Sequence, residues 1–507
     1  MVSHNERERF KNLDRLFNPS SIAIVGVSSS AGGASFGRNI LMSHIAMGYA
    51  GKLYPVNKSG GTIAGLPIYA CVDDIPGDID FAIIAVPAQF VPGVIDACRK
   101  KGAAGVAVTS SGFRETGTPE GIALEEEIRA IAAKGIRVLG PNCFGVYCPR
   151  SGQTLLPGPD LSREPGGVAF LSQSGGHSID VGHIGKWRGV KFSKVVSFGN
   201  GCDLRETEML RYLLHDPDTK VICMYIEGVA DGREFLAALK ETGRVKPVIV
   251  IKGGLSESGS RAAASHTASL SGQRGIWEAA LRQCNAIQVK NIEEMMDAAL
   301  AFSLLPERAY HGCTITGGGG ALGIAAADAA ESCGLTIPRL RKDLQASILE
   351  LLPKPGSSAA NPIDIANPHV PPEVIKEALM RASQDDNVDI HIVISLLYHM
   401  KAAKYHLGAE DIRAISPHRK LVEACREAME RADRHVVLVL PNHKQEEDGL
   451  EVEEIIRETR RLFIEAGIPV YDDVKNALRA IAAVSMYYQR RGTQTGREEG
   501  ERRKAVG

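Results

Sequence analysis

Short apolar runs that end in small or polar residues recur along the chain, and this pattern limits its fold more than any other feature. Residues 21–27, 167–172 and 312–316 are such runs, and each passes through a Gly/Ser-rich turn into a segment with helical periodicity. Continuous short apolar runs are typical of strands that helices cover on both faces of a parallel sheet. The pattern therefore predicts an α/β protein built from doubly wound parallel sheets.

The chain of 507 residues is long enough for several such sheets, and the runs divide it into three expected domains and a tail. We expect a Rossmann-like domain over 1–145 and flavodoxin-like domains over 146–305 and 309–485. Residues 486–507 are expected to be a disordered tail, because the chain from about 489 is rich in Arg, Glu and Gly and has no aromatics. Further strands are expected at 52–56, 80–86, 105–109 and 137–139, at 195–197, 221–226 and 247–251, and at 390–396 and 436–441.

Charge and composition argue against several classes of partner. The formal net charge of −1 gives no electrostatic reason to expect nucleic acid or a membrane surface. No apolar run reaches transmembrane length, and the charged segment 1–15 is unlike a signal peptide. The ten cysteines include no Cys-x-x-Cys pair, so we expect free thiols and no metal site. Together these features predict a cytoplasmic protein.

Two turns have the composition of an anion site. The stronger one follows the strand at 167–172 and comprises Ser172, Gln173, Ser174, Gly175 and Gly176. It opens a helix, where backbone N–H groups and the helix dipole favour phosphate or carboxylate. The glycines 317–320 stand at a second helix start, although such runs also occur where a helix and a strand merely pack closely.

The first domain has a weaker nucleotide signal. Its loop at 26–30 joins a strand to a helix, but the spacing is not Gly-x-Gly-x-x-Gly. Its second strand ends in Asn57 and Lys58, where an NAD-binding domain would place an acidic residue for the ribose 2′-OH. A lysine instead suits a phosphorylated ribose, as in CoA with its 3′-phosphate. A Rossmann-like domain for another nucleotide is the alternative.

The segment 253–272 is a long connection rich in Gly, Ala and Ser, and it contains one imidazole, His266. Connections of this length are usually functional or disordered, and histidine is a side chain that titrates near neutral pH and can act as a nucleophile. Glu227 ends an apolar strand, where a charge is costly unless it has a partner. The alternatives are a surface loop with an incidental histidine and a solvent-facing glutamate.

Several motifs together resemble one enzyme family. They are Lys-x-Gly at 252–254, Ala-Ala-Ala-Ser-His-Thr-x-Ser-Leu-x-Gly at 262–272, Tyr-x-Glu-Gly at 225–228, Tyr-Pro-Val-Asn at 54–57, Gly-Pro-Asn-Cys at 140–143 and Asn-Pro-Ile-Asp at 361–364. In this combination the chain resembles the NDP-forming (ADP-forming) acyl-CoA synthetases, relatives of succinyl-CoA synthetase. The resemblance covers nearly all of residues 15–485.

The resemblance implies a role for each of these sites. His266 would carry a phosphoryl group, and Glu227 would hydrogen-bond the phosphorylated ring and fix its tautomer. The first domain would hold CoA through Gly26, Ser28, Ser30, Lys58, Pro87, Asn142 and Cys143. Phosphate or substrate would lie at Ser172, Gln173, Ser174, Gly175, Gly176, Gly199, Asn200, Gly318, Gly319 and Gly320. His177 is expected to have a structural or supporting role.

The resemblance also implies partners. No ATP-grasp region is recognisable in the sequence, so the chain would be an α subunit that needs an ATP-grasp β subunit in an α2β2 hetero-oligomer. ATP or ADP with Mg²⁺ would bind on the partner subunit. The other substrates would be CoA, phosphate and a small carboxylic acid or its acyl-CoA.

Three departures from the family pattern keep other functions open. Leu255 stands where arginine is usual, Ala268 replaces a usual glycine and Ser271 replaces a usual alanine. The first removes a charge that could pair with phosphate, and the second stiffens a hinge. A non-catalytic sensor of CoA or acyl-CoA and an acyltransferase that uses no nucleotide are therefore the alternatives to a synthetase.

Overall fold

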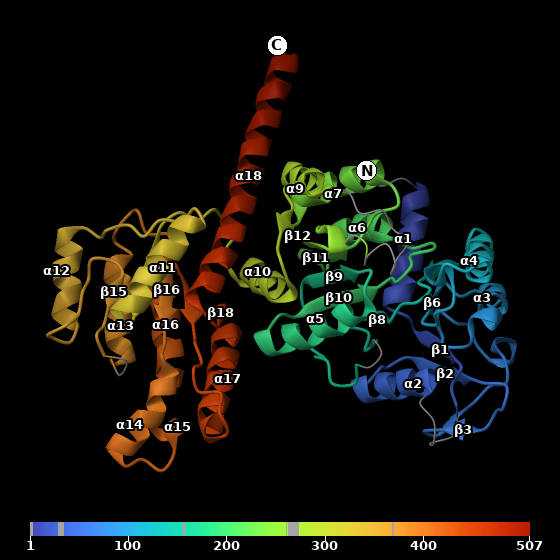
Figure 1. The fold of residues 1–507 in the computed structure, drawn as a ribbon, viewed down its shortest axis with the longest axis horizontal. Helices are drawn as coiled ribbons and strands as arrows, with labels where there is room; N and C mark the ends of the chain where they lie inside the picture. The colour runs from blue at the N-terminus through green and yellow to red at the C-terminus, as the bar shows by residue number, and fades with distance from the viewer. Residues whose placement is uncertain are drawn as a thin grey trace. The chain divides into compact units, whose positions relative to one another are not determined.

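The computed structural model describes residues 4–28, 35–154, 158–259, 261, 273–367 and 370–506. Within these ranges the backbone forms three large sheets with helices between their strands, so the expected α/β fold class is confirmed (Figure 1). The chain divides into two compact units, residues 1–295 and 296–507.

The first sheet is wholly parallel, and its strands β1, β5 and β6 are buried at every position, which explains their continuous apolar sequence. In spatial order it contains β2 (Lys52–Val56), β1 (Ser21–Val25), β5 (Phe81–Ile84), β6 (Gly105–Val108) and β7 (Arg137–Leu139). Its other elements are α1 (His4–Phe17), α2 (Phe36–Met47), β3 (Thr62–Ile63), β4 (Leu66–Pro67), η1 (Val72–Asp74), η2 (Ala88–Phe90), α3 (Val91–Lys100), η3 (Arg114–Thr116) and α4 (Pro119–Ala132).

The second sheet has six strands, of which only β8 runs antiparallel to its neighbour. In spatial order they are β13 (Ile287–Gln288), β12 (Val248–Lys252), β11 (Val221–Ile226), β9 (Val168–Ser172), β10 (Phe192–Ser197) and β8 (Gly145–Tyr147). The helices are α5 (Gly175–Arg188), α6 (Glu206–His215), α7 (Gly232–Val245) and α9 (Arg274–Gln283), and α10 (Ile292–Leu304) crosses the boundary between the two units.

The expected domains 1–145 and 146–305 each keep a sheet of their own, but the two sheets pack around one shared apolar core. Phe17 at the end of α1 stacks on Tyr212 of α6 with ring centroids 5.2 Å apart. Arg137 on β7 forms ion pairs with Asp203 at 2.9 Å and Glu208 at 2.6 Å. This joint packing makes residues 1–295 a single compact unit.

The third sheet is again parallel and belongs to the second unit. In spatial order it contains β15 (Ile363–Asp364), β14 (Cys313–Gly317), β16 (Ile390–Ile394), β17 (His435–Val439) and β18 (Val470–Tyr471). The helical elements are α11 (Gly320–Ser332), α12 (Lys342–Leu351), α13 (Pro372–Ala382), η4 (Leu397–His399), α14 (Met400–Leu407), α15 (Ile412–Ile415), α16 (His418–Ala432), η5 (Glu447–Gly449), α17 (Leu450–Glu465) and α18 (Val474–Val506).

The end of the chain differs from the sequence expectation. Residues 486–506, expected to be a disordered tail, continue the helix α18 that begins at Val474 (Figure 1). The physical reason is that Arg, Glu and Gln are good helix formers and no proline interrupts the segment, so a helix once begun can propagate. In the part of the chain that the structure describes, no helix combines the length and apolar character needed to cross a membrane.

Candidate functional site

The turn after β1 is packed so closely that two of its positions need glycine. Gly26 has φ +102°, and a Cβ there would lie 2.2 Å from the carbonyl oxygen of Ala85. A Cβ on Gly37 would lie 2.5 Å from the carbonyl oxygen of Gly26, which brings the start of α2 against the strand end. Ser28 is half-buried, and Ser30 lies outside the described residues. The close approach of Gly37 to Gly26 brings the first turn of α2, whose backbone N–H groups favour anions, against the end of β1.

Lys58 and the segment after Pro87 meet beside this turn. The Lys58 ammonium lies 4.9 Å from the ring centroid of Phe90, in the short helix η2 that Pro87 precedes. The Phe90 ring is 47% exposed, although a large aromatic side chain is normally buried. An exposed ring with a cation on its face offers a stacking surface next to a positive charge.

Cys143 does not present its thiol to a ligand. Its side chain is 1% exposed, and its Sγ lies 3.4 Å from the carbonyl oxygen of Val108, to which it donates. Burial raises the pKa of the thiol to about 12, so the group is neutral at physiological pH. Asn142, one residue earlier, has φ +55° and donates its backbone N–H to Ser110 at 2.9 Å. The 142–143 turn can therefore contribute backbone atoms and the Asn142 side chain, but not the thiol.

Gly199 and Asn200 pack against the same turn from the second sheet. A Cβ on Gly199 would lie 2.3 Å from the carbonyl oxygens of both Pro141 and Asn142, and the Asn200 N–H donates to Pro141 at 3.0 Å. The Asn200 side-chain amide donates to Glu115 Oε2 at 2.5 Å and to Glu125 Oε2 at 3.0 Å. This amide therefore joins carboxylates of the first sheet's domain instead of facing a ligand.

The turn at 172–176 is held by its own side chains. The Ser172 hydroxyl donates to the Ser174 carbonyl at 2.8 Å and accepts from the Ser174 N–H at 3.0 Å. Ser174 caps α5 by accepting from the His177 N–H at 3.3 Å. Helix geometry leaves the N–H groups of Gly175 and Gly176 without intrahelical acceptors, so these two glycines supply the donors for an anion.

Gln173 links this turn to the end of β11. Its Oε1 accepts from the backbone N–H of Glu227 at 2.5 Å and of Gly228 at 3.1 Å. The Glu227 side chain itself is 5% exposed, which contradicts the solvent-facing alternative. Its Oε1 accepts from the Tyr225 hydroxyl at 3.2 Å. Burial, together with the nearby Glu227 charge, raises the pKa of Tyr225, so this hydroxyl remains a donor.

His266 lies outside the described residues, as do Ala268 and Ser271, so the expected contact between His266 and Glu227 stays a prediction. The segment before the loop is described and lies directly beside Glu227. A Cβ on Gly253 would be 3.4 Å from Glu227 Cγ and 2.8 Å from the Tyr225 hydroxyl. His177 contacts the same tyrosine, with ring centroids 4.3 Å apart, which fits its expected supporting role.

The glycines of the third sheet already have a carboxylate beside them. Gly319, with φ +104°, donates its N–H to Asp364 Oδ1 at 3.4 Å, and a Cβ on Gly320 would lie 3.4 Å from Asp364 Oδ2. The same Oδ1 accepts from the Ala366 N–H at 2.9 Å. A carboxylate at this helix start stabilises the helix dipole and competes with a second anion.

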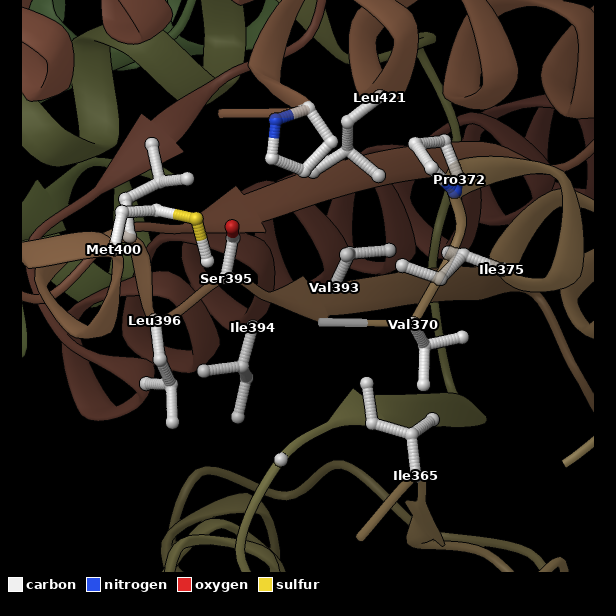
Figure 2. A pocket seen from close by; sticks show the side chains of 13 residues that line it. Ile365, Val370, Pro372, Ile375, Val393, Ile394, Ser395, Leu396, Met400 and Leu421 are labelled. Atoms are coloured by element: carbon white, nitrogen blue, oxygen red, sulfur yellow. The ribbon is translucent and has the colours of Figure 1, made fainter. Parts of the chain in front are cut away.

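An apolar pocket lies next to these glycines in the second unit (Figure 2). It measures about 20 Å³, which is room for about one water molecule or methyl group. Ser395, at the end of β16, is the hydroxyl-bearing side chain in it (Figure 2). Its lining is otherwise Gly318, Ile365, Val370, Pro372, Ile375, Val393, Ile394, Leu396, Leu397, Met400, Pro417 and Leu421.

Sequence reasoning missed four side chains that shape these sites. Tyr225, Lys252 and Asp364 were visible only as parts of motifs, and Glu115, which lies in the short helix η3, carried no special signal. Lys252 could have been noticed on the ground used for Glu227, because it is a charge at the end of a buried strand. Across the described ranges no cluster of three or more His, Cys, Asp or Glu residues could hold a metal ion.

Two family descriptions match the chain. Residues 20–149 match a CoA binding domain, and residues 165–302 match the succinyl-CoA ligase like flavodoxin domain. The first match contains the whole first sheet and β8 of the second sheet, and the second match contains the other five strands of the second sheet and extends past residue 295 into the second unit.

Full-length relatives extend the similarity over the third sheet. The acetate–CoA ligase [ADP-forming] I subunit alpha of Pyrococcus furiosus is 35% identical over 482 residues, covering 93% of this chain and 97% of the relative. The acetate–CoA ligase [ADP-forming] I of Archaeoglobus fulgidus is 35% identical, but the chain spans only 64% of its length. The solved dinucleotide forming acetyl-coenzyme A synthetase 1 of Ca. Korarchaeum cryptofilum, in complex with phosphate and ADP, superposes with a TM-score of 0.79 at 31% identity, covering 95% of this chain and 97% of that one.

Proposed function

The chain belongs to the ADP-forming acyl-CoA ligase family, and from this membership we propose that it is the α subunit of an ADP-forming acid–CoA ligase. The supporting observation is the 35% identity to an α subunit along 97% of that subunit's length. The relatives carry the names of ADP-forming ligases, which favours this function over a CoA sensor or an acyltransferase without nucleotide.

The proposed reaction has three steps. Phosphate attacks the acyl carbon of an acyl-CoA, which releases CoA as a thiol and leaves an acyl phosphate. A ring nitrogen of His266 then attacks the phosphorus, which releases the carboxylate and gives a phosphohistidine. ADP accepts the phosphoryl group and becomes ATP. Phosphoryl transfer asks the protein mainly for positioning and charge neutralisation.

Each residue has a proposed part in these steps. Glu227 would accept a hydrogen bond from the His266 ring, because its buried carboxylate lies against the start of the loop that contains His266. The N–H groups of Gly175 and Gly176 would bind the phosphoryl oxygens. Lys58 would pair with the 3′-phosphate of CoA, and the exposed Phe90 ring beside it suits an aromatic base.

A partner subunit would complete the enzyme. The chain matches relatives named as α subunits, and it spans 64% of one relative that is a single longer chain. We propose that an ATP-grasp β subunit binds ADP or ATP with Mg²⁺, and that the two subunits form an α2β2 assembly in the cytoplasm.

Phosphoryl labelling tests the proposed function. We expect the chain to acquire one acid-labile, alkali-stable phosphate from acetyl-CoA plus ³²P-phosphate, or from γ-labelled ATP with the partner present. His266→Ala should abolish the label and keep CoA binding, because the CoA-binding residues lie on the other sheet. Mass spectrometry identifies the site, and phosphate on His177 or on a loop serine with His266 unmodified would contradict the proposal.

A further inference from the structure

Lys252 is a buried cation at the end of β12. Its side chain is 5% exposed, and an ammonium group is seldom buried unless partners replace its water. The proposed reaction assigns it no part, so its burial needs a separate explanation.

The partners of Lys252 belong to three segments of the chain. Its Nζ donates to the carbonyl oxygen of Glu227 at 2.8 Å and to the carbonyl oxygen of Gly253. The same Nζ lies 5.1 Å from the ring centroid of Trp277, in the first turn of α9. Gly253 precedes the segment that contains His266, and Trp277 follows it, so both flanks of that segment meet at one ammonium group.

Other contacts fix the same three segments. The Gly253 N–H donates to the Ile226 carbonyl at 2.9 Å, which seats the start of the loop on the end of β11. The Trp277 ring also packs on Phe235 of α7, with centroids 6.1 Å apart. Lys252 adds a contact between Trp277, which follows the His266 segment, and the ends of β11 and β12.

We propose that Lys252 is a positioning residue that clips the two flanks of the His266 loop to the strand end that carries Glu227. The contacts of Lys252 do not depend on the proposed function, whereas the effect on His266 rests on it. By holding the first turn of α9 at the strand end, the ammonium group fixes both ends of the connection that contains His266 and would limit the positions open to His266 relative to Glu227.

The electrostatics of the pair agree with this role. Burial lowers the pKa of Lys252, and the nearby charge of Glu227 opposes that shift. An ammonium held on a tryptophan face gains a cation–π attraction that strengthens as water is excluded.

Tryptophan fluorescence tests the clip without any turnover. The chain has two tryptophans, and Trp187 is 50% exposed, so Trp187→Phe leaves Trp277 as the reporter. In that background Lys252→Met should raise acrylamide quenching of Trp277 by about twofold or more, while Lys252→Arg should stay near the parent value.

A second buried lysine supplies the matched control. Lys194 on β10 is 2% exposed and pairs with Asp216 at 2.5 Å. Its ammonium group also lies 5.5 Å from the Phe17 ring and 5.8 Å from the Tyr212 ring, and none of these partners belongs to β11, β12 or α9. Lys194→Met should leave Trp277 quenching unchanged. Equal acrylamide quenching of Trp277 in Lys252→Met and in its parent would overturn the proposal that Lys252 holds Trp277 in place.

Phosphoryl labelling tests the consequence for His266. With acetyl-CoA and ³²P-phosphate, Lys252→Met should label at least about tenfold more slowly at unchanged CoA affinity, and Lys252→Arg should recover most of the rate. Lys194→Met, assayed where it is folded, should label at the parent rate; slowing equal to that of Lys252→Met would overturn the positioning role. A wild-type chain that takes up no label would overturn the proposed function, whereas Trp277 quenching would still decide the clip.

Discussion

Replacing Asn200 with alanine should destabilise the first unit without touching the phosphate site. The sequence places Asn200 among the expected phosphate ligands, but its amide donates to Glu115 and Glu125 of the neighbouring domain. If that bridge is its role, Asn200→Ala should lower the free energy of unfolding and leave phosphoryl labelling intact.

The loss of stability depends on the hydrogen bonds and ion pairs that each carboxylate retains. Glu115 loses a 2.5 Å bond but retains the N–H groups of Gly112 at 2.7 Å and Phe113 at 3.2 Å on its other oxygen. Glu125 loses a 3.0 Å bond and retains its two arginine partners. One hydrogen bond to a charged group contributes about 1.5–3 kcal/mol, and the second, with its acceptor still paired, about 0.5–1 kcal/mol. The total is about 2–4 kcal/mol, or, for a unit that spans residues 1–295, a fall in Tm of roughly 3–6 °C.

Calorimetry at pH 7 measures this shift, with Asn57→Ala as the control. The Asn57 side chain accepts a local hydrogen bond from the Ser59 N–H at 3.1 Å, and the backbone hydrogen bonds of Asn57 do not depend on its side chain, so the substitution should cost less than about 1 kcal/mol. A fall below about 1 °C for Asn200→Ala would refute the bridge. Loss of phosphoryl labelling at unchanged stability would show that Asn200 acts at the phosphate site.

The same bridge should depend on pH. Burial acts to raise the pKa of Glu115, but hydrogen bonds from Asn200, Gly112 and Phe113 outweigh it and hold the pKa below its usual 4.5. A lowered pKa in the folded state adds stability above pH 4.5 that is lost as the pH falls through the folded value. The Tm difference between wild type and Asn200→Ala should therefore shrink below that pH, and a constant difference from pH 7 to pH 3 would contradict the argument.

Three further changes test the proposed site. Lys58→Ala should weaken the binding of CoA by about 1.5–3 kcal/mol in titration calorimetry and leave the binding of dephospho-CoA unchanged; equal losses for the two ligands would show that Lys58 does not contact the 3′-phosphate. Glu227→Gln should slow labelling of the chain with an unchanged circular dichroism spectrum, because it keeps an acceptor but loses the charge that stabilises a protonated or phosphorylated ring; wild-type labelling would remove Glu227 from the mechanism. Cys143→Ala should lower the Tm and leave CoA affinity unchanged, whereas a large loss of affinity in the folded variant would mean that the thiol contacts CoA.

The amino-acid sequence determined the sheets and the family of this protein. Strands such as Val168–Ser172 and Val248–Lys252 are apolar up to their last residue because both faces of a parallel sheet are covered, and this requirement acts on each strand's own residues. The Gly and Ser turns after them, and the positive φ at Gly26 and Gly319, follow from the same local chemistry. The sequence singled out Glu227 as a charge at the end of an apolar strand but left a solvent-facing side chain open, and its burial is a finding of the structure.

The tertiary structure alone decided which partners the polar side chains take. Asn200 reaches Glu115, 85 residues away, and Lys252 brings the strand end at Glu227 together with Trp277. Cys143 turns inward because the turn packs on Val108, and Asp364 lies beside Gly319 because β15 pairs with β14. Such pairings depend on how sheets and helices pack at a distance, and no spacing within a single segment encodes them. A local motif therefore predicts where a site lies, while packing between distant segments decides which side chains remain available to a ligand.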